Sequence, residues 1–272
     1  MSEIRRCGLE YKDKVVVITG GSMGIGKGCA EVFCDAGSTV VICARNKGPG
    51  EALADELNAK GPGKCHFETC DVSKAENIER LIARTVELFS QIDCLINNAG
   101  YHPPHKPITE FTAEDFTHLL QTNLLSFFLA SKYALPYLRK VRGSIINMGS
   151  LVGIMGQEGA TTYCATKGAV SGFTKALAVE EAHNGVRVNA VLPGNIVTES
   201  RIKFIDSLEN GKETDRWLDS LQVAGRSGTI AETGQLCLFL ASDAASFLTG
   251  IELIISGGAE LGYGVKYPLR FL

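Results

Sequence analysis

Lys14-Val-Val-Val-Ile-Thr-Gly20, followed by Gly21-Ser-Met-Gly24-Ile-Gly26, is the stretch of this chain that decides its fold. The unbroken apolar run predicts a buried strand, and Cys29-Ala-Glu-Val-Phe-Cys34 continues with helical spacing. A glycine turn between a strand and a helix presents backbone N–H groups at the positive helix end, where a pyrophosphate can approach closely. The stretch therefore predicts a dinucleotide site. A magnesium-dependent phosphate loop is excluded because Gly28 stands where that loop needs a hydroxyl.

Short apolar runs alternate with helical patterns along the whole chain, as is typical of parallel βαβ units. Their Val, Ile and Leu content lacks clean alternation, which suits strands buried on both faces. We expect seven strands, at about 14–19, 39–44, 65–69, 92–97, 143–148, 186–191 and 251–255. The predicted fold class is α/β, with residues 1–272 forming a single-domain, Rossmann-like, doubly wound seven-stranded parallel sheet with helices on both faces.

The composition limits the partners and the compartment. The 272 residues are 45% hydrophobic, which is enough for one large core, and a net charge of −3 with both signs interspersed argues against nucleic acid and anionic membranes as partners. No apolar run approaches the length of a membrane span and no apolar signal segment opens the chain, so we expect a cytoplasmic protein. Nine scattered cysteines without a CxxC are expected to be reduced core residues, and no metal site is expected.

Tyr163-Cys-Ala-Thr-Lys167 places a phenol and an ammonium four residues apart, on one face of a helix. The Lys167 ammonium would favour the phenolate and lower the pKa of Tyr163, which makes the tyrosine a usable acid or base. Ser150 ends a strand-like run and can donate a hydrogen bond to a substrate oxygen while Tyr163 exchanges a proton with it.

These motifs resemble the short-chain dehydrogenase/reductase family, whose pattern is TGxxxGxG, then NNAG, an Asn, a Ser and YxxxK. The resemblance covers about residues 12–260. It implies an NAD(P)-dependent alcohol dehydrogenase or ketoreductase that transfers a hydride reversibly between a secondary alcohol and the nicotinamide. The matching positions are Thr19 to Gly26, Asn97 to Gly100, Asn123, Ser150, Tyr163, Lys167, Pro193, Gly194 and Thr198.

The resemblance also implies roles for individual residues. Asn123 would hold a water that links Lys167 to solvent, although a helix-interior Asn with a local hydrogen bond fits the sequence too. Asp71 would bind the adenine, or would equally serve as a helix cap. The implied catalytic residues are Asn123, Ser150, Tyr163 and Lys167. The implied cofactor-binding residues are Gly20, Ser22, Gly24, Ile25, Gly26, Arg45, Asp71, Val72, Asn98, Ala99, Gly100, Tyr163, Lys167, Pro193, Gly194, Ile196 and Thr198.

Within the family, the segments 102–104, 134–140, 150–153 and 257–264 look most like 17β-hydroxysteroid dehydrogenases of type 14. This likeness implies a 17β-hydroxysteroid or similar substrate; a small polyol or an aldose such as fucose is the alternative. The implied substrate contacts are His102, Ser150, Gln157, Tyr163 and Asn195, with apolar walls from Leu151, Met155 and Ile196. His102 could also be an exposed loop residue.

Two further expectations concern a substrate lid and the functional class of the protein. Residues 199–227 are polar and amphipathic and contain the only tryptophan, Trp217. They form either a surface helix pair or, as the family implies, a lid over the substrate at about 195–228. A non-catalytic dinucleotide-binding sensor or scaffold is the alternative from another class. Because Asn123, Ser150, Tyr163 and Lys167 are all present, the enzyme interpretation is favoured.

The dinucleotide preference depends on the residue after the second predicted strand. NAD-preferring members place an acidic residue there for the ribose hydroxyls, and type 14 enzymes carry Asp. This chain has Ala44 followed by Arg45. A guanidinium without a neighbouring carboxylate favours a 2′-phosphate, so we predict NADP, with NAD possible. The alternative is that Arg45 and Lys47 are solvated loop charges.

Five residues at helical spacing follow Tyr163, and all but the phenylalanine are small enough to permit close helix approach: Ala165, Ala169, Gly172, Phe173 and Ala176. Core packing within one chain explains part of this pattern. The family resemblance implies a homotetramer in which such helices pair across a two-fold axis. A tail at 260–272, with Tyr263 and Tyr267, would then lie near a subunit boundary.

Overall fold

Seven parallel strands form the central sheet, in the order β3-β2-β1-β4-β5-β6-β9. The structure, a computed structural model, describes residues 8–262 and 264–266. Every predicted strand is present, with small differences at the ends, and the predicted fold class is confirmed. The strands are β1 (Val15–Thr19), β2 (Thr39–Ala44), β3 (Lys64–Thr69), β4 (Cys94–Asn97), β5 (Ser144–Met148), β6 (Arg187–Pro193) and β9 (Glu252–Ile255).

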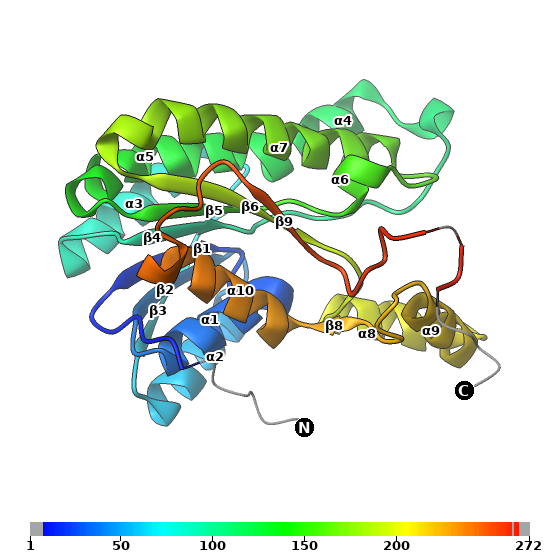
Figure 1. The fold of residues 1–272 in the computed structure, drawn as a ribbon, viewed down its shortest axis with the longest axis horizontal. Helices are drawn as coiled ribbons and strands as arrows, with labels where there is room; N and C mark the ends of the chain where they lie inside the picture. The colour runs from blue at the N-terminus through cyan, green and yellow to red at the C-terminus, as the bar shows by residue number, and fades with distance from the viewer. Residues whose placement is uncertain (1–7, 263, 267–272) are drawn as a thin grey trace.

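Helices cover both faces of this sheet (Figure 1). One face packs against α1 (Gly24–Asp35), α2 (Lys47–Lys60) and α10 (Ile230–Ala241), and the other against α3 (Ala75–Phe89), α5 (Ser126–Val141) and α7 (Thr161–Glu181). Fully buried side chains such as Phe33 on the first face and Leu138 on the second fill the two layers between helices and sheet. The strands are therefore buried on both sides, which explains their unalternating apolar sequences.

Helices α1 and α10 touch through their backbones. A Cβ on Gly28 would lie 2.4 Å from the carbonyl oxygen of Ile230, and one on Gly234 would lie 2.6 Å from the carbonyl oxygen of Gly28. Two glycines thus let the helices pack more closely than any side chain allows. This contact fixes α1 against the sheet, so the N-terminus of α1 has a defined position at the end of β1.

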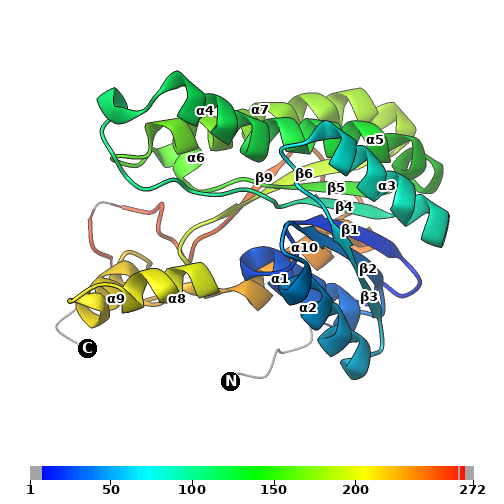
Figure 2. The same cartoon turned by 180° about the vertical axis from the view of Figure 1, so that it is seen from behind.

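The segment 195–228 folds as a separate layer beside the sheet's carboxyl edge (Figures 1 and 2). It contains α8 (Glu199–Asp206) and α9 (Gly211–Ser220). A parallel pair of two-residue strands, β7 (Ile196–Val197) and β8 (Gly228–Thr229), joins its two ends. The strand pair is absent from our predictions because two residues carry no periodicity. The remaining elements are α4 (Ala113–Leu120), a π-turn (Gln121–Leu125), α6 (Val152–Met155) and three 3-10 turns at Ile108–Glu110, Ala182–Asn184 and Asp243–Ala245.

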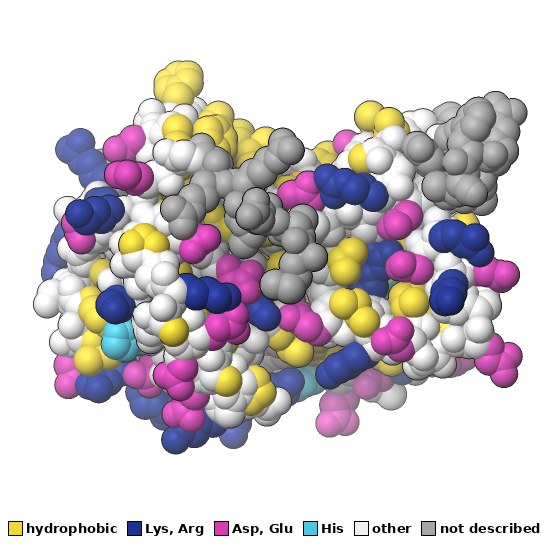
Figure 3. All heavy atoms as spheres, turned by 90° about the horizontal axis from the view of Figure 1, so that it is seen from below, with side chains coloured by type: hydrophobic (Ala, Val, Ile, Leu, Met, Phe, Trp, Pro, Cys, Tyr) yellow, Lys and Arg dark blue, Asp and Glu magenta, His cyan; other side chains and the backbone are white. Residues whose placement is uncertain are grey.

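The surface shown in Figure 3 carries acidic and basic side chains side by side, without a large area of one sign. No helix in the described ranges is long and apolar enough to cross a membrane. Within the same ranges no cluster of His, Cys, Asp and Glu has a metal-binding arrangement. The eight described cysteines are free thiols, and all but Cys164 are buried, as expected for reduced core residues.

Candidate active site

The carboxyl ends of β1, β4, β5 and β6 bring the predicted site residues to one edge of the sheet. Gly20 follows β1, Asn98 follows β4, Ser150 follows β5 and Gly194 follows β6. The chain order reverses between β1 and β4, which lie side by side while β2 and β5 flank them. Ligands of doubly wound sheets bind at this kind of switch point.

The glycine turn after β1 is built to leave room above α1. Gly20 and Gly24 have φ of +66° and +54°, which side chains rarely adopt. A Cβ on Gly26 would lie 2.3 Å from the carbonyl oxygen of Gly20, so Gly26 serves the packing of the turn itself. A Cβ on Gly24 would meet only Thr198, at 3.6 Å, within 4 Å. The missing side chain at Gly24 thus allows close approach to the backbone of the turn, where the Gly24 N–H donates to the Glu199 carboxylate at 2.8 Å. The turn fits the dinucleotide that the family implies.

Thr19 and Asn98 brace the turn. The Thr19 hydroxyl accepts hydrogen bonds from the backbone N–H of Asn98 (3.0 Å) and of Ala99 (3.1 Å), and Asn98 Nδ2 donates to the carbonyls of Thr19 (2.9 Å) and Gly20 (3.0 Å). The side chain of Asn98 is therefore occupied in holding β1 to β4. Sequence reasoning gave no role to Thr19, although its position directly before the glycine turn was the available signal.

A buried amide network between β4, β5 and α7 was also missed. Asn97 Nδ2 donates to Asn147 Oδ1 at 2.9 Å and to Ser131 Oγ at 3.1 Å, while Asn147 Nδ2 donates to Thr174 Oγ1 at 2.9 Å. Asn97 and Asn147 are fully buried. Such a network ties the strand that carries Ser150 to the helix that carries Tyr163. Asparagine inside the apolar run of β5 was the sequence signal.

The four predicted catalytic residues lie around the N-terminal half of α7. Lys167 is 4% exposed, and its Nζ donates a 2.7 Å hydrogen bond to the carbonyl oxygen of Met148. Asn123 lies in the π-turn; its Oδ1 accepts from the backbone N–H of Tyr101 and its Nδ2 donates to the carbonyl of Tyr101, both at 3.0 Å. Because π-turns widen a helix at functional positions, Asn123 reaches across to the loop after β4 instead of bonding its own helix.

The pKa values of the pair differ from our prediction. Burial raises the pKa of Tyr163 to about 12, and the hydrogen bond with the neighbouring Ser150 hydroxyl offsets this rise only in part. Burial lowers the pKa of Lys167 to about 8. The prediction that Lys167 lowers the tyrosine pKa is wrong, because both groups lose solvation and the ammonium donates to the Met148 carbonyl instead of to the phenol.

The predicted substrate residues His102 and Gln157 meet above Tyr163. The rings of His102 and Tyr163 have centroids 4.2 Å apart, tilted by 41°. His102 Nε2 lies 3.2 Å from Gln157 Oε1, and its Nδ1 lies 2.6 Å from the carbonyl oxygen of Pro103. His105 stacks on the same imidazole at 4.9 Å. His102 is exposed, but its ring contacts Tyr163, so it does not lie in an unattached loop.

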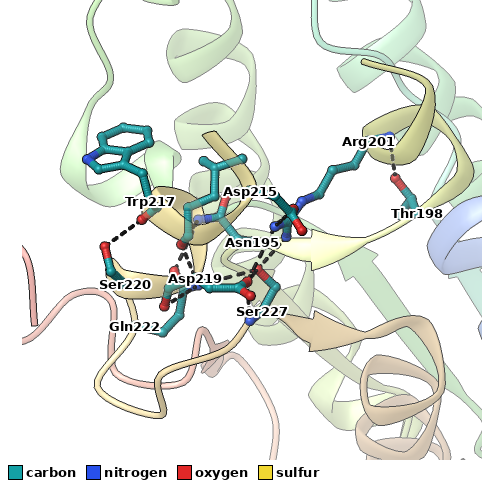
Figure 4. Close-up of polar contacts among 10 residues, drawn as sticks. Asn195, Thr198, Arg201, Asp215, Trp217, Asp219, Ser220, Gln222 and Ser227 are labelled. Carbon is teal, nitrogen blue, oxygen red and sulfur yellow. Dashed lines mark hydrogen bonds and ion pairs between the residues drawn. The ribbon is translucent and has the colours of Figure 1, made fainter. Parts of the chain in front are cut away.

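Asn195 lies against α9 and the residues that follow this helix (Figure 4). Its Nδ2 donates to Gln222 Oε1 at 3.1 Å and to the carbonyl of Leu218 at 3.4 Å. Beside it the Arg201 guanidinium pairs with Asp215 at 2.6 Å and Asp219 at 3.4 Å. The side chain of Arg201 is 11% exposed, so these pairs hold α8 and α9 together as one unit. None of these charged residues was predicted, although Asp215 and Asp219 stand four residues apart.

The residues expected at the far end of the dinucleotide lie at the ends of β2 and β3. Arg45 is exposed and makes no hydrogen bond or ion pair with other described residues, whereas Lys47 pairs with Glu51 at 3.5 Å. Burial raises the pKa of Asp71, but hydrogen bonds from the Ser73 hydroxyl and N–H and the charges of Arg45 and Lys74 outweigh it and lower the pKa overall. The Arg45 charge is thus one of the causes that lower the pKa of Asp71.

Comparisons with known proteins agree with this geometry. A family model described as enoyl-(acyl carrier protein) reductase matches residues 20–260. L-fucose dehydrogenase of Bos taurus is 46% identical over 259 residues, which cover 95% of this chain and 94% of that protein. L-sorbose reductase from Gluconobacter frateurii, solved with NADPH and L-sorbose, has a TM-score of 0.89 and 26% identity, covering 94% of this chain and 99% of that one.

Aldohexose dehydrogenase of Thermoplasma acidophilum has a TM-score of 0.84 and 30% identity, covering 94% of this chain and 98% of that one. None of these relatives is named for a steroid, so the expected likeness to type 14 hydroxysteroid dehydrogenases finds no support among them. The family is shown by the matching model, by the relative at 46% identity and by the arrangement of Ser150, Tyr163 and Lys167. This chain belongs to the short-chain dehydrogenase/reductase family of oxidoreductases.

Proposed function

We propose that this enzyme is an NADP-dependent dehydrogenase of a small polyhydroxylated substrate, an aldose such as fucose. The observation that carries the proposal is the pair His102 and Gln157, in contact with each other at 3.2 Å and with the His102 ring against the Tyr163 ring. The relatives named for fucose, sorbose and aldohexose support the same substrate class. NAD remains the alternative cofactor.

The chemistry around Tyr163 suits a sugar better than a steroid. An imidazole and a primary amide offer donors and acceptors to adjacent hydroxyls, and a site built on such groups discriminates strongly against a substrate that leaves them unpaired. A steroid would require apolar walls on most sides. Of the expected wall residues, Leu151 and Ile196 are buried in the protein, and Met155 is 54% exposed.

Each of the proposed catalytic residues has its own role in the reaction. Tyr163 phenolate removes the hydroxyl proton of the substrate while the hydride leaves the same carbon, and Ser150 donates a hydrogen bond to the oxygen on which the carbonyl forms. Lys167 holds a proton at Nζ and passes it toward Asn123. The nicotinamide, when bound, supplies the hydride acceptor at C4.

The dinucleotide would be held by the turn from Gly20 to Gly26, by Asp71 and Val72 at the adenine end, and by Pro193, Gly194, Ile196 and Thr198 near the nicotinamide. Arg45 makes no ion pair with another described residue and would take the 2′-phosphate of NADP. The unit formed by α8 and α9 would act as the lid over the substrate.

An exposed apolar strip supports the proposed homotetramer. Leu125 and Phe128 beside the start of α5 are 44% and 46% exposed, and Val179 on α7 is 80% exposed. Ala165, Gly172 and Ala176 on α7 are also exposed. Helices of this kind pair across a two-fold axis. The expected contribution of Tyr263 and Tyr267 in the tail lies outside the described residues.

The test measures NADPH formation by absorbance with L-fucose and with oestradiol at matched concentrations. We expect turnover of the sugar at a kcat/KM at least tenfold above that of the steroid. Tyr163→Phe should lose on the order of 10²–10⁴-fold in hydride transfer while it still binds the nucleotide. Turnover of oestradiol alone would replace the sugar proposal by the steroid, and nucleotide binding without turnover of any secondary alcohol would favour a sensor or scaffold.

A further inference from the structure

A lid carboxylate is seated on the dinucleotide turn. Glu199 Oε2 accepts a 2.8 Å hydrogen bond from the backbone N–H of Gly24, the first residue of α1, and Glu199 Oε1 lies 3.9 Å from Lys27 Nζ. The first residue of α8 thus reaches the first turn of α1, 175 positions earlier in the chain. Gly24 belongs to the turn that the proposed function assigns to the pyrophosphate.

Two helix N-termini face each other at this point. Helix α1 begins at Gly24, and α8 begins at Glu199 with Thr198 as its cap, accepting a 3.2 Å hydrogen bond from the N–H of Arg201. A Cβ on Gly24 would lie 3.6 Å from Thr198 Cγ2, so the two ends are in near contact (Figure 2). Each helix end carries a partial positive charge, and an anion between them is stabilising.

The carboxylate and a pyrophosphate compete for the same groups. Both are acceptors for the unpaired N–H groups of α1, both gain from the positive ends of the two helices, and both attract Lys27. Their negative charges also repel each other across a few ångströms. No other side-chain hydrogen bond to the N–H groups of the Gly20–Gly26 turn occurs within the described ranges.

We infer that Glu199 is an electrostatic latch: it holds the lid helix α8 on the cofactor turn, and the dinucleotide pyrophosphate displaces it on binding. The inference rests on the proposed function, since it needs a dinucleotide at this turn. Because the Arg201 pairs with Asp215 and Asp219 hold α8 and α9 together, release of Glu199 frees the whole lid. Cofactor binding therefore precedes lid movement over the substrate.

The test is nucleotide affinity in Glu199→Gln, measured by direct binding with NADPH and with NADH. Removing the competing charge should lower both Kd values by about tenfold, and by the same factor, because both nucleotides share the pyrophosphate. Glu199→Asp keeps the charge but shortens the side chain, so its Kd values should lie between those of the wild type and those of Glu199→Gln. Glu213→Gln removes the same charge from an exposed position on α9 and should leave both Kd values unchanged.

Lid release has its own readout. Hydrogen exchange of residues 199–206 in nucleotide-free Glu199→Gln should rise to the level of the wild-type enzyme saturated with NADPH, and the fluorescence of Trp217 on α9 should change in parallel. Unchanged or weaker nucleotide binding in Glu199→Gln, beside normal wild-type binding, overturns the latch. A wild-type protein that binds neither nucleotide overturns the proposed function instead.

Discussion

The Nζ atom of Lys167 lies 5.8 Å from the centroid of the Tyr163 ring, although the two residues are one helical turn apart. At this separation, with Nζ bonded to the carbonyl of Met148, burial dominates both groups. It raises the pKa of the phenol to about 12 and lowers the pKa of the amine to about 8. The phenol of Tyr163 is therefore protonated at neutral pH, and the pKa of the Lys167 amine lies closer to neutrality than that of an ordinary lysine.

Replacing Lys167 should stabilise the fold while it abolishes catalysis. The folded-state pKa of about 8 lies below the ordinary value of 10.5, so the unfolded chain binds the proton more tightly and the lysine costs stability at pH 7. The full cost is on the order of 3 kcal/mol, offset by roughly 1 kcal/mol from the bond to Met148. We expect Lys167→Met to raise the free energy of unfolding by about 2 kcal/mol at pH 7.

This gain should shrink as the pH rises from 8 to 10.5, because the unfolded lysine then also loses its proton. Denaturant titrations of both proteins at several pH values measure this difference in the free energy of unfolding. The exposed Lys212→Met is the control and should show no such trend. A loss of stability in Lys167→Met at pH 7 would contradict the burial cost.

Ser150 should set the pH at which oxidation begins. Its hydroxyl lowers the pKa of Tyr163, so Ser150→Ala leaves burial unopposed and raises that pKa further. Since oxidation uses the phenolate, kcat/KM should rise with pH in both enzymes, with the profile of the variant displaced to higher pH. The loss of the donor itself should cost about 10²-fold in kcat. Ser150→Thr keeps a hydroxyl and should restore part of both effects; a profile of Ser150→Ala that coincides with wild type would exclude this role.

Arg45 should determine the preference for NADP. Arg45→Ala removes the charge expected on the 2′-phosphate and should weaken NADP binding by roughly ten- to a hundredfold, with little effect on NAD. The readout is kcat/KM for each cofactor with one substrate. Lys47→Ala is the matched control, because Lys47 is already paired with Glu51. A wild-type preference for NAD above tenfold would refute the assignment.

The apolar strip of α5 and α7 should be required for assembly. Phe128→Glu places a charge on the exposed strip, where desolvation of an unpaired carboxylate opposes close helix pairing. We expect sedimentation to show dissociation of the tetramer at micromolar concentration. Leu88→Glu, on the outer face of α3 and 39% exposed, is the control and should sediment like wild type. A wild-type monomer at this concentration would remove the proposed assembly altogether.

The sequence alone determined the sheet and the location of the site. Unalternating Val and Ile runs such as Val15–Thr19 are typical of strands covered on both faces, and the glycines after β1 allow the positive φ at positions 20 and 24. Ser150, Tyr163 and Lys167 could be named from their spacing because one helix face and one strand end bring them together. Local periodicity depends only on residues that are close in the sequence, so it can be recognised without the tertiary structure.

The tertiary structure decided how deeply those residues are buried and which polar groups they contact. The direction of the Tyr163 pKa shift depends on how much protein surrounds the phenol, which no spacing of side chains encodes. The contacts of Glu199 with Gly24, of Asn195 with Gln222 and of Asn97 with Asn147 join positions dozens to 175 residues apart. Hydrogen bonds and desolvation act over a few ångströms of space, whatever the distance along the chain, and only the folded chain fixes which groups lie within that range.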